Sequence, residues 1–382
     1  MPYTNEAIYN EYGFVGEDIS RMLLNLSPFE TPLLDALNAP AGPAINIAHQ
    51  WEEHKLGPDT IIASAAINSA TAATGILING LGASLQVGML LEVEVNTAGT
   101  TNEIIQITSA VGPNSILASR NFASRGISSL VAGGTLSVVA TALIEGADAL
   151  GSVYVPPVRK TNYCHIFGKE VVVTGTASAV KFNPDRGSLM MFETAKITQE
   201  LHRDLEKAVI RGAASGNSIG SGSAYRTMDG LRALLTGINS TVVASSFTAD
   251  PVGYLTDVWQ SAYSAGARDI DLIVCGPKFK RDLSAVNAVK SFIIAPQSET
   301  VVQRVIDEVR TDFGTARVIV SPWMSSSALM GISTRRSFVV PLQRRQFGFE
   351  QLSKTGDADK AQVIGEYTLE CNRADLMFHL HI

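Results

Sequence analysis

The sequence has few charged residues and almost no cysteine. Charged side chains make up only 17% of the 382 residues, so the surface is thinly charged, and we expect part of it to be covered by other molecules, such as further copies of the chain. The three cysteines, Cys164, Cys275 and Cys371, are far apart and form no CxxC pair. This spacing indicates neither a zinc knuckle nor a disulfide framework, and it favours buried reduced thiols.

A basic region and long apolar runs are also missing. The net charge is −6, no basic tail occurs and the only Arg–Arg pairs are Arg335–Arg336 and Arg344–Arg345, which argues against tight, sequence-specific binding of nucleic acid. The chain starts with a polar, acidic stretch that does not resemble a signal peptide, and no uninterrupted apolar run reaches the length of a membrane span. We therefore expect no membrane partner.

Motifs of catalysis and cofactor binding are absent as well. The sequence has no GxSxG motif, and the glycine-rich segment 216–223 lacks the lysine of a phosphate-binding loop, so it is more typical of a hinge. The histidines come without a third ligand at a metal-site spacing, and His202 is expected to pair with Glu206 along a helix. We expect no catalytic, cofactor or metal site, and no enzyme. The six histidines are His49, His54, His165, His202, His379 and His381.

The clearest positive feature is a long amphipathic helix over residues 188–212. Ser188 offers a start and Gly212 a left-handed stop, and a helix of this length measures about 35 Å. One face is apolar and the other, which includes Arg203 and Glu206 as a surface pair, is charged. The apolar stripe consists of Leu189, Phe192, Ala195, Thr198, Leu201, Leu205, Ala208 and Val209.

The first half of the chain has two distinct parts. Residues 1–45 are broken repeatedly by Pro28, Pro32, Pro40 and Pro43 and predict an arm that packs on a neighbouring subunit. Residues 60–142 carry short β patterns separated by Gly, Asn and Pro turns, which predicts a small all-β module inserted between other segments. Its expected strands are 75–78, 89–95, 103–108, 115–118 and 135–139, and residues 142–150 have a weak helical pattern.

The second half alternates between helix and strand patterns. Helices are predicted over 250–266 and 277–286, and another over 302–309 that stops near Gly314. Together with the long helix these elements predict an α+β fold. Residues 155–161 are expected to be extended, and the expected strands outside the inserted module are 45–52, 164–176, 271–275, 317–320, 328–332, 338–342 and 362–371.

The order of these elements resembles that of tailed-bacteriophage major capsid proteins with the Hong Kong 97 fold. It is most similar to the group in which a β domain interrupts the extended loop. The resemblance covers most of the chain. It is carried by SPFETPLLDAL, HQWEEHKLGP, KEVVVTGTASAV, RTMDGLRALL, TDFGTARVIVSPWM and LSKTGDADKAQVIGEYTLECNRADLMFHL, in that order.

The resemblance implies a division of the chain and a structural role. Copies would form the pentamers and hexamers of an icosahedral head shell that encloses double-stranded DNA, with assembly in the bacterial cytoplasm. The implied parts are an arm (1–45), an extended loop (46–175) with its β insertion (60–142), a spine helix with the peripheral domain (176–235), an axial domain (236–332), and C-terminal strands that return to the peripheral domain (333–382).

Partners are expected to be other copies of the chain, a portal protein and decoration or scaffolding proteins, with packaged DNA contacted only non-specifically. The arginine pairs are candidates for ion pairs between subunits. An encapsulin-like compartment and a β-rich surface or adhesion protein are the alternatives. The candidate contact residues are Arg335, Arg336, Arg344, Arg345, Glu52, Glu53, Glu193 and Asp204.

Overall fold

The chain divides into two compact units, of which the second is inserted in the first. Unit 1 consists of residues 1–51 and 160–382, and unit 2 of residues 52–159. Strands β2 (Ala48–Glu53) and β9 (Val158–Tyr163), on the segments that lead into and out of unit 2, form a two-stranded sheet. The computed structural model describes residues 30–38, 42–54, 56–57, 59–66, 74–79, 85–93, 102–112, 114–124, 126–127, 132–146, 148, 155–179, 188–215, 225–235, 238–241, 250–264, 266–267, 269–290, 308–334, 339–354 and 356–381.

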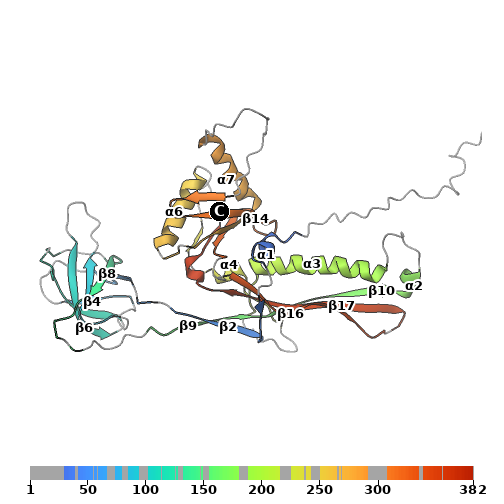
Figure 1. Ribbon diagram of the computed structural model, residues 1–382, viewed down its shortest axis with the longest axis horizontal. Coiled ribbons are helices and arrows are strands. Elements are labelled where there is room, and N and C mark those ends of the chain that lie inside the picture. Colours follow the sequence, from blue (N-terminus) through green and yellow to red (C-terminus); the bar gives the residue numbers. More distant parts are fainter. Residues whose placement is uncertain are drawn as a thin grey trace, which may run out of the picture. The chain divides into compact units, whose positions relative to one another are not determined.

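The first layer of unit 1 is the long helix α3 (Leu189–Arg211), which lies along a four-stranded sheet (Figure 1). Strand β17 (Ala358–Cys371) pairs antiparallel with β10 (His165–Thr174) and with β16 (Val339–Gln351), and the short β1 (Gly42–Pro43) runs parallel to β16. The helix buries Leu201, Leu205 and Val209 in one core with sheet residues such as Phe167 and Tyr367. The C-terminal half of the apolar stripe predicted from the sequence is therefore the face that covers this sheet, whereas Ala195 of the same stripe is exposed.

The second layer is a six-stranded sheet with the strand order β11-β18-β15-β12-β14-β13. All four residues of β12 are buried, as expected for a central strand that is covered on both faces. Leu272 and Val274 pack in the core of α3, whereas Ile273 and Cys275 pack in a second core with Trp259 of α6 and Phe279 of α7.

The remaining elements of unit 1 complete this layer and its connections. The described residues also form the helices α6 (Pro251–Ser264) and α7 (Pro277–Lys290), the short helices α1 (Pro32–Ala36), α2 (Gly175–Ala179) and α4 (Leu231–Leu234), and the 3₁₀ turn η5 (Ala374–Leu376). The strands are β11 (Ile238–Thr241), β12 (Leu272–Cys275), β13 (Glu308–Thr311), β14 (Gly314–Val320), β15 (Ala328–Ile332) and β18 (Phe378–His381).

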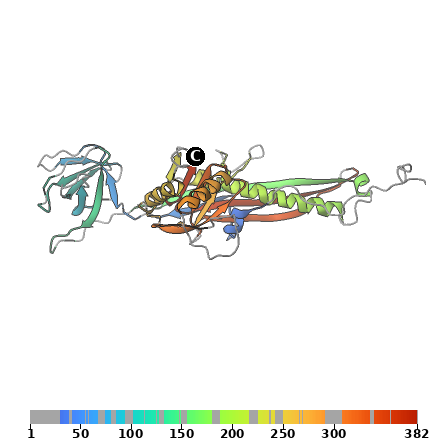
Figure 2. The same ribbon diagram turned by 90° about the horizontal axis from the view of Figure 1, so that it is seen from above.

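Unit 2 is a small antiparallel barrel, and Figure 2 shows its strands curled around one another. The two outer strands of the sheet, residues 60–62 and 74–77, are joined by a bridge between Ala63 and Ile78 and by a hydrogen bond from the Ser64 N–H to the Leu77 carbonyl. The interior holds alternate aliphatic residues such as Ile105 and Leu136. Around the barrel the order is β3 (Thr60–Ile62), β8 (Thr135–Thr141), β5 (Met89–Val93), β6 (Glu103–Gly112), β7 (Ser115–Ser119) and β4 (Thr74–Leu77).

Three local predictions from the sequence are wrong. Residues 308–311, expected to lie in a helix, form strand β13, because Val309 fills the core of the sheet by pairing with β14. No helix occurs in the described residues of 142–150. Gly212 ends α3 with φ −51°, not in the left-handed region.

Gly212 is required for a different reason, which is the close approach of two backbones. Its carbonyl accepts a hydrogen bond from the Gly230 N–H at 3.0 Å. A Cβ atom at Gly212 would lie 2.7 Å from the Met228 carbonyl oxygen, and one at Gly230 would lie 2.5 Å from the Ala208 carbonyl oxygen, so only glycine fits at both positions. The pair locks the end of α3 to the segment that begins α4.

The division into domains has one unexpected feature in the last strand. Strands β16 and β17, within the C-terminal segment 333–382, lie in the sheet of α3, but β18 pairs with β11 and β15 in the six-stranded sheet. The chain therefore crosses between the two sheets of unit 1 once more than the expected division has it.

Candidate assembly surfaces

A buried carboxylate attaches the short helix α1 to the long helix α3. Glu206 is fully buried, and its two oxygens accept hydrogen bonds from the backbone N–H groups of Leu33 and Leu34, each at 3.4 Å, while the Ser321 hydroxyl donates to it at 3.1 Å. Thr31, the residue before α1, makes no side-chain cap. Glu206 thus supplies from another element the acceptor that the first turn of α1 needs.

This environment changes the acidity of Glu206. The pKa of Glu206 is raised from 4.5 to about 7: burial is the main cause, the hydrogen bonds from Leu33, Leu34 and Ser321 act in the opposite direction, and the nearby Asp35 adds to the rise. No cation forms an ion pair with Glu206 among the residues that the structure describes. The carboxyl group therefore titrates near neutral pH while it holds residues 33–34 in place.

The sequence analysis placed Glu206 on the exposed face, and this was wrong. Instead of pairing with Glu206, His202 contacts the Thr198 carbonyl through Nδ1 at 2.9 Å, and Arg203 lies 3.9 Å from Asp204. Val209 and Ile210, three and four residues after Glu206, are both buried. This widening of the apolar stripe was the signal that could have placed Glu206 in the core.

Trp323 holds the same segment from the other side. Its indole N–H donates to the Glu30 carbonyl at 2.9 Å, and the Lys207 ammonium lies 4.5 Å from the centre of its ring. Leu33, Leu34 and Leu37 fill the core beneath. Residues 30–37, a part of the expected arm, are thus fixed to unit 1 of their own chain.

A cluster of arginines surrounds one carboxylate on β17. Glu366 is buried and lies 2.5 Å from Arg344, 3.1 Å from Arg226 and 3.6 Å from Arg345. Arg345 also lies 3.9 Å from the exposed Glu350. Three cations thus share one buried and one exposed carboxylate, which leaves an excess of positive charge on this part of the sheet.

Cys164 and His165 lie close to the arginine cluster, and their surroundings shift their pKa values. The Arg226 guanidinium donates to the Cys164 carbonyl at 2.5 Å. Burial raises the pKa of the Cys164 thiol, and burial together with the Arg226 charge lowers the pKa of His165. The thiol is therefore an inert buried group rather than a nucleophile.

The other candidate contact residues are dispersed over the chain. Glu52 pairs with Arg159 at 2.8 Å on an exposed surface, and Glu193 lies 3.6 Å from Lys196 on α3. Asp204 is the most occupied, with Lys169 at 3.0 Å and Lys207 at 3.7 Å. Glu53 is half-buried on β2, and Arg335 and Arg336 lie outside the described residues. Within unit 1, the described candidates Glu193 and Asp204 thus have ion-pair partners other than the arginines of the Glu366 cluster.

Unit 2 contains a buried ion pair that the sequence analysis did not single out. Glu103 accepts hydrogen bonds from Arg120 at 2.6 and 2.5 Å, and also from the Asn121 N–H at 2.8 Å. Both side chains of the ion pair are almost completely excluded from solvent. Its role is structural, because the pair links β6 to the end of β7.

The described parts of the chain offer little for metal or membrane binding. Within them, no group of three or more His, Cys, Asp and Glu residues is arranged to hold a metal ion. None of the described helices combines the length and the apolar character that a membrane crossing requires.

The described residues thus form a long helix on a narrow sheet, with an inserted barrel. The model of one family, the SU10 major capsid protein, matches residues 2–380. The chain belongs to this family: it is a major capsid protein, a structural protein of the viral shell, and not an enzyme. No curated protein matches the chain.

Solved structures of other shells are similar to this chain at low identity. The capsid of Myoviridae phage XM1 is 9% identical, with 96% of each chain covered and a TM-score of 0.46. The structure of Mycobacterium phage Che8 is 12% identical, with 79% of this chain and 86% of that chain covered and a TM-score of 0.39. The SrpI encapsulin of Synechococcus elongatus is 12% identical, with 59% and 75% covered and a TM-score of 0.37. The assignment rests on the family match and not on these likenesses.

Proposed function

We propose that copies of this chain form the pentamers and hexamers of an icosahedral phage head of the Hong Kong 97 type, which encloses double-stranded DNA. The observation that carries the proposal is the arrangement of unit 1, in which α3 runs along a sheet of long antiparallel strands (Figure 1). In this interpretation α3 is the spine helix and the sheet of β10, β16 and β17 belongs to the peripheral domain. The six-stranded sheet with α6 and α7 is the axial domain.

In the same interpretation unit 2 is an insertion in the extended loop. The segments that lead into and out of it pair as β2 and β9, as two arms of a long loop would. The expected module, 60–142, falls inside unit 2, 52–159. We assign to the barrel a role in strengthening contacts between capsomers.

Electron microscopy of the purified protein tests the shell. Closed particles of uniform size support it, whereas fibres or small particles contradict it. DNA inside shells isolated from infected bacteria would support a phage head. Shells that hold a cargo enzyme and no DNA would support the encapsulin-like alternative, and fibres would favour a surface or adhesion protein.

The role of unit 2 is tested by replacing about residues 60–140 with a short linker. We expect shells that break at a lower temperature or under a weaker osmotic shock than wild-type shells. Shells of unchanged resistance would contradict the role in strengthening, while the shell itself would stand.

We further propose that the arginine cluster around Glu366 binds a carboxylate of the neighbouring subunit. Arg344 and Arg345 are 36% and 44% exposed at their side chains, so part of their excess charge faces outward. Of the expected acidic partners, Glu52 and Glu193 are the most available, because each makes one exposed ion pair of little energy. Asp204 is the least available, since it already has cations around it.

Charge reversal tests this contact. Arg345→Glu is expected to reduce shell assembly, and a second change of Glu52 or Glu193 to Lys is expected to restore it. Equal assembly of Arg345→Glu and wild type would contradict the contact. Arg335 and Arg336 belong to the same proposal and are tested in the same way. A portal, decoration or scaffolding proteins, non-specific contact with packaged DNA and assembly in the host cytoplasm complete the proposed setting.

A further inference from the structure

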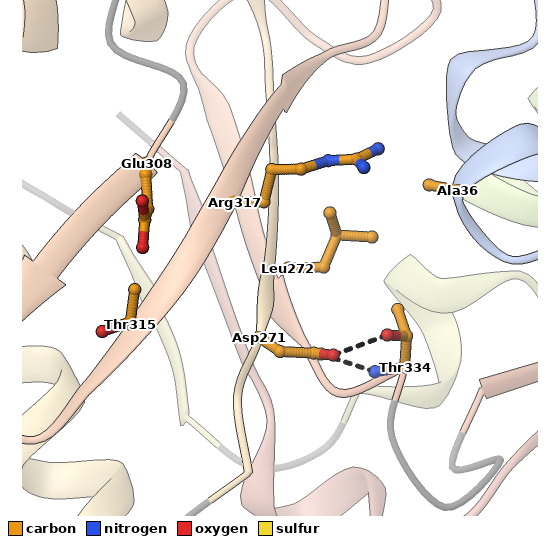
Figure 3. A pocket seen from close by; sticks show the side chains of 7 residues that line it. All are labelled: Ala36, Asp271, Leu272, Glu308, Thr315, Arg317 and Thr334. Atoms are coloured by element: carbon orange, nitrogen blue, oxygen red, sulfur yellow. Dashed lines mark hydrogen bonds between the residues drawn. The ribbon is translucent and has the colours of Figure 1, made fainter.

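A second feature of unit 1, separate from the arginine cluster, is a pocket of about 540 Å³ where α1 meets the edge of the six-stranded sheet (Figure 3). Its walls come from α1, from β13 and β14, from the start of β12 and from the segment after β15. The residues that line it are Ala36, Asp271, Leu272, Glu308, Thr315, Arg317 and Thr334.

The pocket contains Arg317, which does not pair with the acidic residue opposite it on the neighbouring strand. Glu308 stands directly opposite Arg317 in the pairing of β13 with β14, so the two side chains would normally form a cross-strand ion pair. Glu308 instead pairs with Arg310 at 3.2 Å. Figure 3 shows the two side chains pointing apart, with the Arg317 guanidinium extended toward Ala36.

The other carboxylate of the pocket is engaged with the rim. Asp271 accepts hydrogen bonds from the N–H of Thr334 at 2.7 Å and from its hydroxyl at 2.6 Å. These bonds fix the segment after β15 as one wall. In the described parts of the chain no carboxylate lies within 4.0 Å of the Arg317 guanidinium, and Arg317 is exposed.

We propose that the Arg317 pocket receives an Asp or Glu side chain of a second copy of this chain in the assembled shell. The inference rests on self-assembly, which membership in a capsid protein family establishes. A guanidinium binds a carboxylate through two parallel N–H···O bonds, which are stronger and more specific in geometry than its bonds to a neutral acceptor. Leu272 and Ala36 give the methylene groups of the incoming side chain an apolar wall.

Charge and concentration favour a second copy as the source of this carboxylate. The chain has 36 acidic and 30 basic residues, so its copies carry surplus carboxylates. A closed shell also holds neighbouring copies at a high effective concentration, which strengthens each weak contact between them. The pocket wall from α1 is held rigidly by Glu206, so the site exists before the partner arrives.

The first test compares Arg317→Gln with Arg310→Gln. Both arginines are exposed and lie on adjacent strands, but Arg310 already has its carboxylate in Glu308. We expect Arg317→Gln to require about tenfold more protein for assembly, and to lose part of the salt dependence of assembly, while Arg310→Gln matches wild type. Unassembled Arg317→Gln should melt at the wild-type temperature. Equal assembly of the two variants overturns the proposal.

The second test identifies the occupant. A photoreactive benzoylphenylalanine at Thr315, on the exposed rim of the pocket, is irradiated in assembled shells. Covalent dimers whose linked peptide contains Asp or Glu support the proposal. Products within one chain, or with a different virion protein, overturn it.

A small anion is the remaining occupant to be distinguished. If inorganic phosphate raises the melting temperature of wild type but not of Arg317→Gln, and assembly is the same in both, the pocket holds a free anion and the proposal is overturned. Wild-type protein that forms no shells would instead contradict the proposed shell, which distinguishes the two failures.

Discussion

Replacement of the buried Glu206 by Gln should change how the stability of the subunit depends on pH. The folded protein holds the pKa of Glu206 at about 7, against 4.5 when the chain is unfolded. Protonated Glu206 therefore contributes stability that is fully present below pH 4.5 and is lost as the pH rises through 7. The interval between the two pKa values, at about 1.4 kcal/mol for each unit, corresponds to about 3 kcal/mol.

Glutamine has the shape of the protonated acid and carries no charge at any pH. One of its terminal atoms still accepts a hydrogen bond from α1, and the loss of the second acceptor adds a constant cost of about 1 kcal/mol. The free energy of unfolding of Glu206→Gln minus that of wild type should thus rise by about 3 kcal/mol between pH 4.5 and pH 8.

Urea unfolding of the unassembled full-length chain, at intervals from pH 4.5 to pH 8.5, measures this difference. The difference is more informative than either curve, because His165 and His379 have lowered pKa values and favour the folded state as the pH rises. Their contribution is the same in both proteins and cancels. Glu193→Gln, which removes a half-buried carboxylate from the same helix, is the control and should lack the rise of about 3 kcal/mol. A flat difference for Glu206→Gln as well would refute the account of this carboxyl group.

Three further changes test other contacts. Gly230→Ala should destabilise unit 1 by about 1–3 kcal/mol, because the new Cβ atom would meet the Ala208 carbonyl. Gly57→Ala is the control: its Cβ atom would meet nothing within 4 Å, so the same urea titration should show almost no change. Arg120→Met should lower the stability of unit 2 by about 3–5 kcal/mol, because it removes the cation that pairs with the buried Glu103. Faster hydrogen exchange in residues 52–159 would show this loss, whereas Arg159→Met, which removes a cation from an exposed pair, should change the exchange little. Trp323→Phe keeps a ring but removes the donor to Glu30, so residues 30–37 should exchange faster by roughly fivefold, and unchanged protection would show that the bond is not needed.

The sequence predicted most of the regular elements, because their periodicity is local. The helix expected at 188–212 is α3 at 189–211, and the five strand patterns of the inserted module correspond to β4 to β8. Strand β13 was missed because Val302, Val305, Ile306 and Val309 follow a helical spacing, and only the pairing of Val309 beside β14 decides in favour of a strand.

The candidate sites were harder to predict, because they depend on contacts between distant segments. Glu206 accepts a hydrogen bond from the N–H of Leu33, which lies 173 positions away in the sequence. No pattern within the helix predicts that this backbone group lies beside it. Nor could the sequence show that the Arg317 guanidinium has no carboxylate partner among the residues that the structure describes. Glu308 and Arg317 are nine positions apart in the sequence, and only the structure shows that Glu308 forms its ion pair with Arg310.

The bridge between Ala63 and Ile78 has a consequence for a protein that accumulates in many copies. A sheet with open sides offers unpaired N–H and C=O groups to any similar strand, and crowded copies can then stack into fibrils. Unit 2 joins β3 and β4, the two outer strands of its sheet, so backbone N–H and C=O groups at these edges pair with each other. Newly made subunits can therefore be concentrated in a cell without this region seeding aggregates, and their association is left to the surfaces of side chains.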